Sequence, residues 1–360
     1  MIYTYDTVTT VHLEITSKCN ASCPMCGRNV NGGSTVKSLP LTELSLSQIK
    51  SIFPEDFIGR LTKFYMCGNY GDPATARDTV AVCEWLKTIN PKMQLGLHTN
   101  GSVRSTDWWT RLAKCLSGTQ DFVRFGIDGL EDTNHLYRKG TVWHKIMHNA
   151  RTYIDAGGSN AQWAFLIFKH NEHQVDAAMQ LSLDMGFTAF IPKKTSRFFN
   201  VNRHDIATNH PVISKSGNTL YYLEPPTDTV FKNESLQNLK HLSNKYGNMQ
   251  AYLDQTKICC KVSQDKSVYV SAEGLVFPCC WTGYIHADNP TANQQAVLDL
   301  IDNNTDNISA LNQSLKSIIN GDFFRKIYNS WTQPSIADGK LQTCASICGQ
   351  EFDRFKSQFS

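Results

Sequence analysis

The sequence lacks the features that would send the chain into or across a membrane. No stretch approaches the roughly eighteen apolar residues that a membrane helix needs. Residues 1–15 carry neither the basic segment nor the long apolar run of a signal peptide. The net charge is only +3, and no run of Lys and Arg with interleaved aromatic residues predicts an obligatory nucleic-acid partner. These absences predict a cytoplasmic protein that acts without a membrane.

Disulfides are not expected either, because the cytosol keeps thiols reduced. The chain nevertheless has 12 cysteines, and their spacing indicates metal binding. One group lies near the N-terminus and a second lies in the C-terminal part, whereas Cys67, Cys83 and Cys115 are scattered and are expected to be core thiols. The two groups are Cys19, Cys23 and Cys26, and Cys259, Cys260, Cys279, Cys280, Cys344 and Cys348.

Short β-rich runs alternate with segments of helical periodicity from Val11 to about Pro192, which predicts βα units around a parallel sheet. Six units without a seventh and eighth predict an open, partial (β/α)6 TIM-like barrel, with functional residues at the carboxyl ends of the strands. The expected strands are Val11–Ile15, Leu61–Met66, Gln94–Thr99, Phe122–Ile127, Trp163–Phe168 and Thr188–Ile191. The expected helices are Ser45–Ile52, Ala76–Ile89, Asp107–Leu116, Trp143–Ala156 and Asn171–Met185, the last beginning with a capping box of Asn171 and Gln174.

The domain organisation follows from this pattern. The barrel is expected over residues 1–200. Residues 201–255, which are rich in Asn, Ser, Thr and Pro at their start, are expected to connect it to a smaller C-terminal module over residues 256–360. That module should contain a β-hairpin and helices that carry the second cysteine group.

The first cysteine group has the spacing C-x3-C-x2-C directly after the first expected strand. Three thiolates can hold three irons of a [4Fe–4S] cluster and leave the fourth iron open, as a catalytic site requires. Zinc is the alternative, but a structural zinc site normally takes four ligands, and a fourth is missing nearby.

This motif in this position resembles the radical S-adenosylmethionine (SAM) superfamily. The resemblance implies a [4Fe–4S] cluster on Cys19, Cys23 and Cys26 and cleavage of SAM to a 5′-deoxyadenosyl radical, which abstracts a substrate hydrogen. It also implies an electron donor of the flavodoxin or ferredoxin type. Further segments after the second, third and fourth strands are similar to SAM-binding positions of the family. These residues are Gly68, Gly71, Asp72, Pro73, Thr99, Asn100, Asp128 and Arg138. Asp72 stands where the family usually has Glu.

The second cysteine group is expected to form one four-thiolate site. The runs 267–270 and 275–277 flank a turn with Gly274, so a hairpin should bring one cysteine of each doublet together, and Cys344-x3-Cys348 can face the same metal. Zinc suits four thiolates as well as iron does. The pattern is similar to the SPASM or twitch module of radical SAM enzymes, which implies an auxiliary [4Fe–4S] cluster. The preferred ligands are Cys260, Cys279, Cys344 and Cys348, with Cys259 and Cys280 as alternates.

The sequence therefore predicts a radical SAM enzyme that oxidises or rearranges a small molecule with help from an auxiliary cluster. Only eighteen residues precede Cys19, too few for a leader-peptide-binding domain, which favours a small substrate over the alternative, a ribosomally made peptide or a protein side chain. A non-catalytic iron–sulfur or zinc scaffold is the alternative of another class. Lys193, Lys194 and Arg197 follow the sixth strand and would attract a phosphate or carboxylate, unless they are simply solvated.

Overall fold

The computed structural model describes residues 2–200 and 203–355. Its main feature is a curved eight-stranded sheet with the order β12-β11-β1-β2-β3-β4-β5-β6. Every neighbouring pair is parallel except β11–β12, which is antiparallel. The strands are β1 (Thr10–Leu13), β2 (Lys63–Met66), β3 (Gln94–Thr99), β4 (Phe122–Gly126), β5 (Ala161–Ile167), β6 (Ala189–Lys194), β11 (Ser267–Val270) and β12 (Val276–Phe277).

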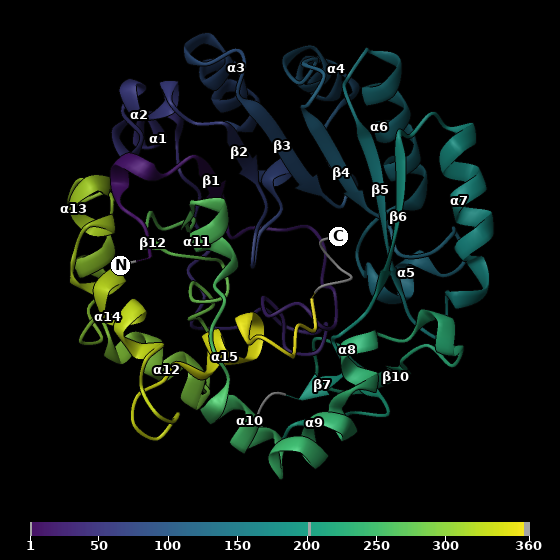
Figure 1. The fold of residues 1–360 in the computed structure, drawn as a ribbon. Coiled ribbons are helices and arrows are strands. Elements are labelled where there is room, and N and C mark those ends of the chain that lie inside the picture. The colour runs from purple at the N-terminus through teal and green to yellow at the C-terminus, as the bar shows by residue number, and fades with distance from the viewer. Residues whose placement is uncertain (1, 201–202, 356–360) are drawn as a thin grey trace.

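Helices cover the outer face of this sheet (Figure 1). They lie between consecutive parallel strands, as right-handed βαβ crossovers require. They are α1 (Leu46–Ile52), α2 (Glu55–Gly59), α3 (Thr79–Ile89), α4 (Thr106–Cys115), α5 (Asn134–Tyr137), α6 (Trp143–Asp155) and α7 (Val175–Asp184), of which α5 lies at the end of the strands instead. Short 3-10 turns occur at η1 (Tyr5–Thr7), η2 (Pro73–Thr75) and η3 (Glu172–Gln174). The expected six-unit partial barrel is confirmed.

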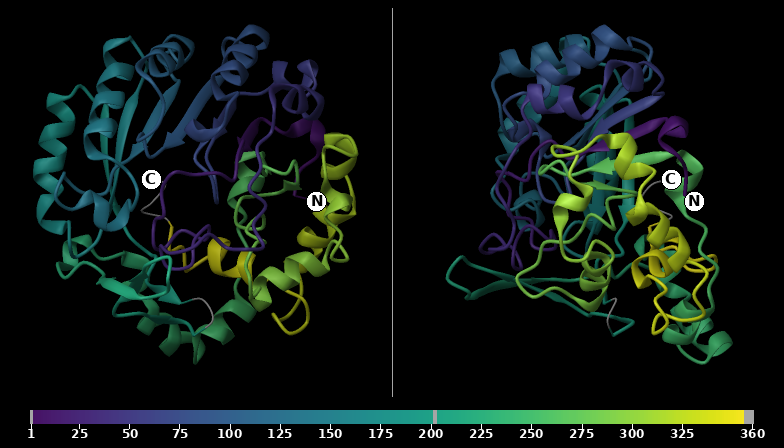
Figure 2. Two further views of the ribbon diagram at one scale, coloured as in Figure 1. Left: turned by 180° about the vertical axis from the view of Figure 1, so that it is seen from behind. Right: turned by 90° about the vertical axis from the view of Figure 1, so that its left-hand side faces the viewer.

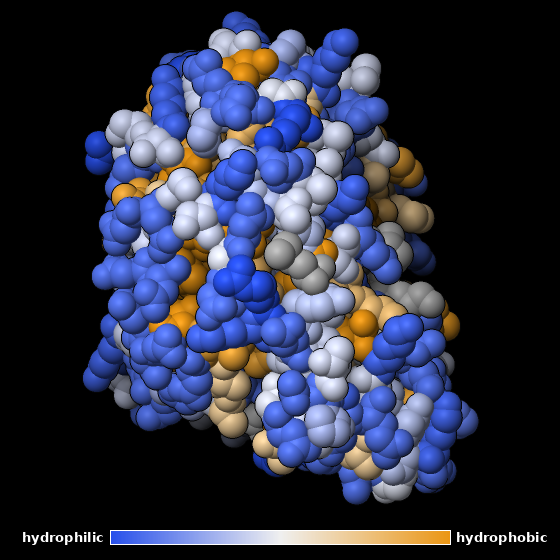
Figure 3. Space-filling model, turned by 60° about the vertical axis from the view of Figure 1, so that its left-hand side comes forward, coloured by the Kyte–Doolittle hydropathy of each residue, from blue (hydrophilic) through white to orange (hydrophobic). Residues whose placement is uncertain are grey.

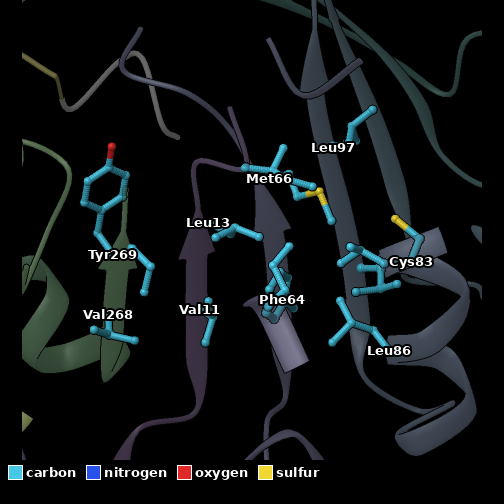
Figure 4. Close-up of a cluster of buried hydrophobic side chains, with 14 of the residues drawn as sticks. Val11, Leu13, Phe64, Met66, Cys83, Leu86, Leu97, Val268 and Tyr269 are labelled. Carbon is cyan, nitrogen blue, oxygen red and sulfur yellow. The ribbon is translucent and has the colours of Figure 1, made fainter. Parts of the chain in front are cut away.

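The alternation of side chains along each strand separates two faces. On the outer face, Val11, Phe64 and Leu97 pack with Leu86 of α3 in a continuous buried core (Figure 4). Burying one such side chain contributes about 1.5–3 kcal/mol. The neighbouring residues on β1 to β4, among them His12, point to the inner face of the curved sheet.

Residues after β6 complete the ring opposite the barrel helices (Figure 1). The β9–β10 hairpin projects from the rest of the molecule in the right-hand view of Figure 2. The elements are β7 (Phe199–Asn200), β8 (Asp205–Ile206), β9 (His210–Ile213), β10 (Thr219–Leu223), η4 (Thr229–Phe231), α8 (Glu234–Gln237), α9 (Leu239–Tyr246), α10 (Met249–Gln255), α11 (Lys261–Asp265), α12 (Ala292–Asp299), η5 (Thr305–Ile308), α13 (Leu315–Ile319), α14 (Asp322–Ser330) and α15 (Gln342–Cys348).

Two features differ from the sequence expectation. The stretch 201–255 carries hairpin strands and three helices, and the hairpin β11–β12 extends the main sheet beside β1. The main sheet thus contains strands from both the expected barrel and the expected C-terminal module. The domain boundaries stay a prediction.

The capping box at Asn171 is wrong. The Asn171 side chain caps no helix. Its Nδ2 donates to the carbonyl oxygens of Asp128 and Leu166, and its Oδ1 accepts from Phe168 N. Gln174 in turn accepts from Leu130 N. Both side chains tie the ends of β4 and β5 together because those loops have buried backbone groups that need partners.

The surface in Figure 3 is largely hydrophilic, with small apolar areas between polar side chains. Within residues 2–200 and 203–355, no helix has the length and apolar character needed to cross a bilayer.

Candidate functional site

The first cysteine group lies on the loop between β1 and α1, at the carboxyl end of β1. Cys23 is buried, and Cys19 and Cys26 are half-buried. Cys23 and Cys26 both lie close enough to Cys19 to influence the ionisation of its thiol. The loop therefore gathers its three thiols on the side where the parallel strands end, as in other barrels with catalytic loops.

Neighbouring loops supply N–H groups to these sulfurs. The Cys19 Sγ accepts from Ala21 N at 3.3 Å and from Asn100 Nδ2 at 3.8 Å, and Arg138 Nη1 lies 4.0 Å from Cys23 Sγ. Burial raises the pKa of the Cys23 thiol to about 11, although Arg138 opposes the shift. Burial also raises the pKa of Cys19. Burial thus favours the protonated thiol at Cys19 and Cys23, and a bound cation would favour their deprotonation.

The segment after β2 packs tightly against the cysteine loop. A Cβ on Gly71 would lie 1.7 Å from the Thr16 carbonyl oxygen, and a Cβ on Gly68 would lie 2.2 Å from the Gly71 oxygen. Any side chain at either position would collide with backbone atoms. Both positions therefore require glycine, because the neighbouring backbone packs directly against them. Pro73 then begins η2 at its first position.

Glu14, which sequence reasoning missed, holds this segment from β1. Its buried carboxylate accepts from Tyr70 N at 2.7 Å, from Gly71 N at 2.9 Å and from the Tyr269 hydroxyl. Burial raises the pKa of Glu14, and these hydrogen bonds oppose the shift. The sequence did contain a signal for this role: Glu14 is an acidic residue directly after a buried strand, at a position that points to the inner face.

Asp72 joins the loops after β2 and β3. Its Oδ1 accepts from Ala74 N at 2.9 Å and from Thr99 Oγ1 at 2.8 Å, and its Oδ2 accepts from Asn100 N at 2.7 Å. Only 5% of Asp72 is exposed, and burial raises its pKa. Its oxygens are therefore engaged in positioning Thr99 and Asn100. The Asn100 side chain donates to Asn20 Oδ1 at 2.9 Å, on the cysteine loop.

Asp128 and Arg138 form an ion pair at the carboxyl end of β4. Arg138 Nε donates to Asp128 Oδ2 at 2.5 Å, and Asp128 Oδ1 accepts from Leu166 N at 2.6 Å. Asp128 is 1% exposed and raises the pKa of Arg138 against the effect of burial. Arg138 is thus held over the cysteine loop rather than solvated.

The second cysteine group converges from three segments. Cys260 precedes α11, Cys279 follows β12, and Cys344 and Cys348 lie one turn apart on α15. The Cys260 thiol forms a hydrogen bond with Cys348, which lowers the pKa of Cys348 to about 7. Cys279 influences the ionisation of both Cys260 and Cys344. The structure therefore brings all four preferred cysteines together.

The other member of each doublet points elsewhere. Cys259 is exposed, and its N–H donates to the Cys348 carbonyl at 2.7 Å, which aligns the two segments. Cys280 faces Cys67 and Glu14 at the inner face of the barrel. Its carbonyl accepts from Asn69 Nδ2 at 2.7 Å, so the segment after β2 is linked directly to the second group.

Among the scattered cysteines, Cys83 is in the core, and Cys115 packs against that core. Cys67 is half-buried and lies on the inner face instead, because it is in register with inward-pointing positions of β2. The expectation of a core thiol at Cys67 is therefore wrong.

Both cysteine groups supply thiols, which are the donors that iron–sulfur clusters and zinc take. Within the described residues, no group of three or more His, Cys, Asp or Glu side chains is arranged to hold one metal ion. In a [4Fe–4S] cluster each thiolate binds a different iron, so its ligands stand farther apart than those of a zinc ion. N–H groups aimed at sulfur, as at Cys19, are also typical of cluster sites. That these cysteines are the ligands stays a prediction.

Comparison with known proteins identifies the barrel. Residues 13–182 match the family model of the radical SAM superfamily. No curated protein sequence matches the chain. The match confirms the expectation of a radical SAM enzyme.

Solved structures share the fold at low sequence identity. Streptococcus suis SuiB bound to precursor peptide SuiA matches with a TM-score of 0.53 and 11% identity, over 98% of this chain and 76% of that chain. The enzyme anSMEcpe with bound AdoMet matches with a TM-score of 0.54 and 14% identity, over 97% of this chain and 95% of that chain. The same protein with AdoMet and the Cp18Cys peptide matches with a TM-score of 0.52. The partial-barrel fold class is thereby confirmed.

Proposed function

Because residues 13–182 form a radical SAM superfamily domain, we propose that the chain cleaves SAM reductively and uses the resulting radical to abstract a substrate hydrogen. The observation that carries the proposal is the meeting of three loops at one end of the sheet. Asn100 Nδ2 donates to Cys19 Sγ and to Asn20 Oδ1 on the cysteine loop, and Asn100 N donates to Asp72 Oδ2, so the loops after β1, β2 and β3 contact one another.

Cys19, Cys23 and Cys26 would hold a [4Fe–4S] cluster, with SAM at the open iron. When bound, the cluster supplies the one electron that splits SAM into methionine and a 5′-deoxyadenosyl radical. The substrate then gives up a hydrogen atom, which yields 5′-deoxyadenosine and a substrate radical.

This chain's residues order the site rather than transfer protons. Asp72 sets the positions of the Thr99 hydroxyl and the Asn100 amide. Arg138, fixed by Asp128, places a positive charge near Cys23. A guanidinium and amide groups in a partly buried site bind a carboxylate well, so these residues are suited to the polar groups of SAM.

The second group, Cys260, Cys279, Cys344 and Cys348, would hold an auxiliary [4Fe–4S] cluster. Four thiolates leave no open iron, so such a cluster serves for electron transfer or structural support. The Asn69–Cys280 hydrogen bond supports this role, since it joins the loop after β2 to the chain next to Cys279. The electron donor would be a protein of the flavodoxin or ferredoxin type in the cytoplasm.

We propose a small molecule as the substrate. A peptide or protein side chain is the second candidate, and one observation favours it: the similar structures of SuiB and anSMEcpe were determined with peptides bound.

The test uses anaerobically reconstituted protein with dithionite and SAM. We expect slow release of 5′-deoxyadenosine without any substrate, and none from the variant Cys19→Ala/Cys23→Ala/Cys26→Ala. Cys259→Ala, at an exposed thiol, is the matched control and should behave like the wild type. Equal release by the triple variant would overturn the proposal, and no release by the wild type would leave the chain a non-catalytic scaffold.

A further inference from the structure

The inner face of the barrel carries positive charge that the site above does not use. Parallel register places His98, Arg124 and Gln162 in one row across β3 to β5, and Cys67, the residue directly after β2, continues that row. All four side chains are half-buried although they lie within the ring. Packing therefore does not close this face, and water or a ligand reaches it.

Arg124 is the fixed cation of this row. Its Nε donates to the neutral Gln162 Oε1 at 2.9 Å, and its guanidinium lies 5.8 Å from the centre of the Phe122 ring. Within residues 2–200 and 203–355, no carboxylate forms an ion pair with Arg124. Partly buried guanidinium groups are normally paired with an anion, because their desolvation is otherwise uncompensated.

Lys193 brings a second cation to the same face. It pairs in register with Leu166, whose side chain packs against the cysteine loop, so Lys193 also points inward. Burial and the nearby Arg124 lower the pKa of Lys193 to about 8, and the charges of Cys67, Asp128 and Arg138 act on it as well. The register places Lys193 four residues beyond Ala189, the β6 partner of Gln162, so Lys193 lies nearer the carboxyl ends of the strands than Arg124 does. Two like charges on one inner face favour entry of an oxyanion.

The structure separates the three cations that follow β6. Lys194 points away and pairs with Glu234 at 2.7 Å, and Arg197 Nη1 donates to Met25 O at 2.9 Å on the cysteine loop. Of the three, Lys193 is the one that the register of β6 places on the inner face with Arg124.

We propose that Arg124 and Lys193 bind an oxyanion of the substrate, a carboxylate or a phosphate, on the inner face of the barrel. This inference rests on the proposed function, and it names the chemical class of the substrate. The Arg124 guanidinium still has free N–H groups in a planar fork, which fits two oxygens of such a group. Cys67 of the same row directly precedes Gly68, so the anion would lie beside the SAM loop. That position would bring the substrate within reach of the radical.

Equilibrium dialysis tests the inference directly. The reconstituted full chain, saturated with SAM so that the open iron is occupied, is dialysed against radiolabelled inorganic phosphate in one arm and radiolabelled acetate in the other. We expect the wild type to retain one of the two anions, which also distinguishes phosphate from carboxylate. Arg124→Gln should weaken retention about 10- to 100-fold, because a charged hydrogen-bond donor is lost.

Two further variants keep the test specific. Arg124→Lys keeps the charge and should retain part of the binding. Arg111→Gln removes an exposed arginine that pairs with Glu84 on the outer helices, and it should bind as the wild type does. Near-ultraviolet circular dichroism checks that each variant is folded.

The outcomes separate this inference from the proposed function. Equal anion retention by wild type and Arg124→Gln, or retention of neither anion by the wild type, overturns the inference. If the same wild-type preparation still releases 5′-deoxyadenosine, the radical function stands and only the anion site fails.

Discussion

The two cysteine groups are built in opposite ways. Cys19, Cys23 and Cys26 share one irregular loop, whereas the second group comes from three segments that span residues 260 to 348. The first is ordered by hydrogen bonds from the barrel loops, such as Asn100 to Cys19. The second is ordered by packing of α11, β12 and α15. The first group therefore depends on one segment and the loops beside it, whereas the second depends on how three distant segments pack together.

Ionisation is similar in the two groups except at one thiol. Burial raises the pKa of Cys23 in the first group, and it raises the pKa of Cys279 and Cys344 in the second. The exception is Cys348, whose pKa the hydrogen bond from Cys260 lowers to about 7. Metal binding therefore has to favour deprotonation of buried thiols in both groups.

The largest expected effect comes from removing the groups in turn. Cys19→Ala/Cys23→Ala/Cys26→Ala, reconstituted anaerobically, should keep about four irons and four sulfides per chain and a thiolate-to-iron charge-transfer band. Adding Cys344→Ala and Cys348→Ala should remove them and lower the thermal stability of the C-terminal part, because that site joins distant segments. Iron and sulfide analysis and thermal unfolding measure both effects. Zinc in the triple variant, purified from iron-replete cells without reconstitution, would instead mark a structural ribbon.

An intermediate effect is expected from Gly71→Ala. The new Cβ would meet the Thr16 carbonyl oxygen at 1.7 Å, so the cysteine loop must shift, at a cost of about 1–3 kcal/mol. We expect less 5′-deoxyadenosine and less iron in the first group, with the second group unchanged. Gly59→Ala is the matched control, because an added Cβ there meets nothing within 4 Å. Equal iron loss from both groups would contradict the view that the contact of Gly71 with Thr16 orders the first group in particular.

The smallest effect is expected from Asp72→Asn. The amide would turn an N–H toward the backbone N–H of Asn100, which then loses its acceptor, at a cost of about 1–3 kcal/mol. SAM affinity, measured by equilibrium dialysis with labelled SAM, should fall, while the iron content of both groups stays the same. Unchanged affinity would show that Asp72 does not position the loop of Asn100 for SAM.

Much of the barrel could be predicted because its signals are local. The strand Gln94–Thr99 was placed to the residue, and the other five were placed to within two or three residues at each end, since alternating apolar runs and helical periods occur within single segments. The capping box at Asn171 failed because a cap was inferred from spacing alone. Its side chain instead satisfies backbone groups of β4 and β5, which are distant in sequence.

The sequence by itself determined the superfamily of this protein: a C-x3-C-x2-C loop after a first strand, followed by turn motifs after the next strands, needs only neighbouring residues to be recognised. Tertiary structure alone decided which cysteine of each doublet faces its group, that β11 joins β1, and that Arg124 and Lys193 share the inner face. Those outcomes depend on register between strands and on packing between segments far apart in the chain. Spacing along one segment carries no information about either.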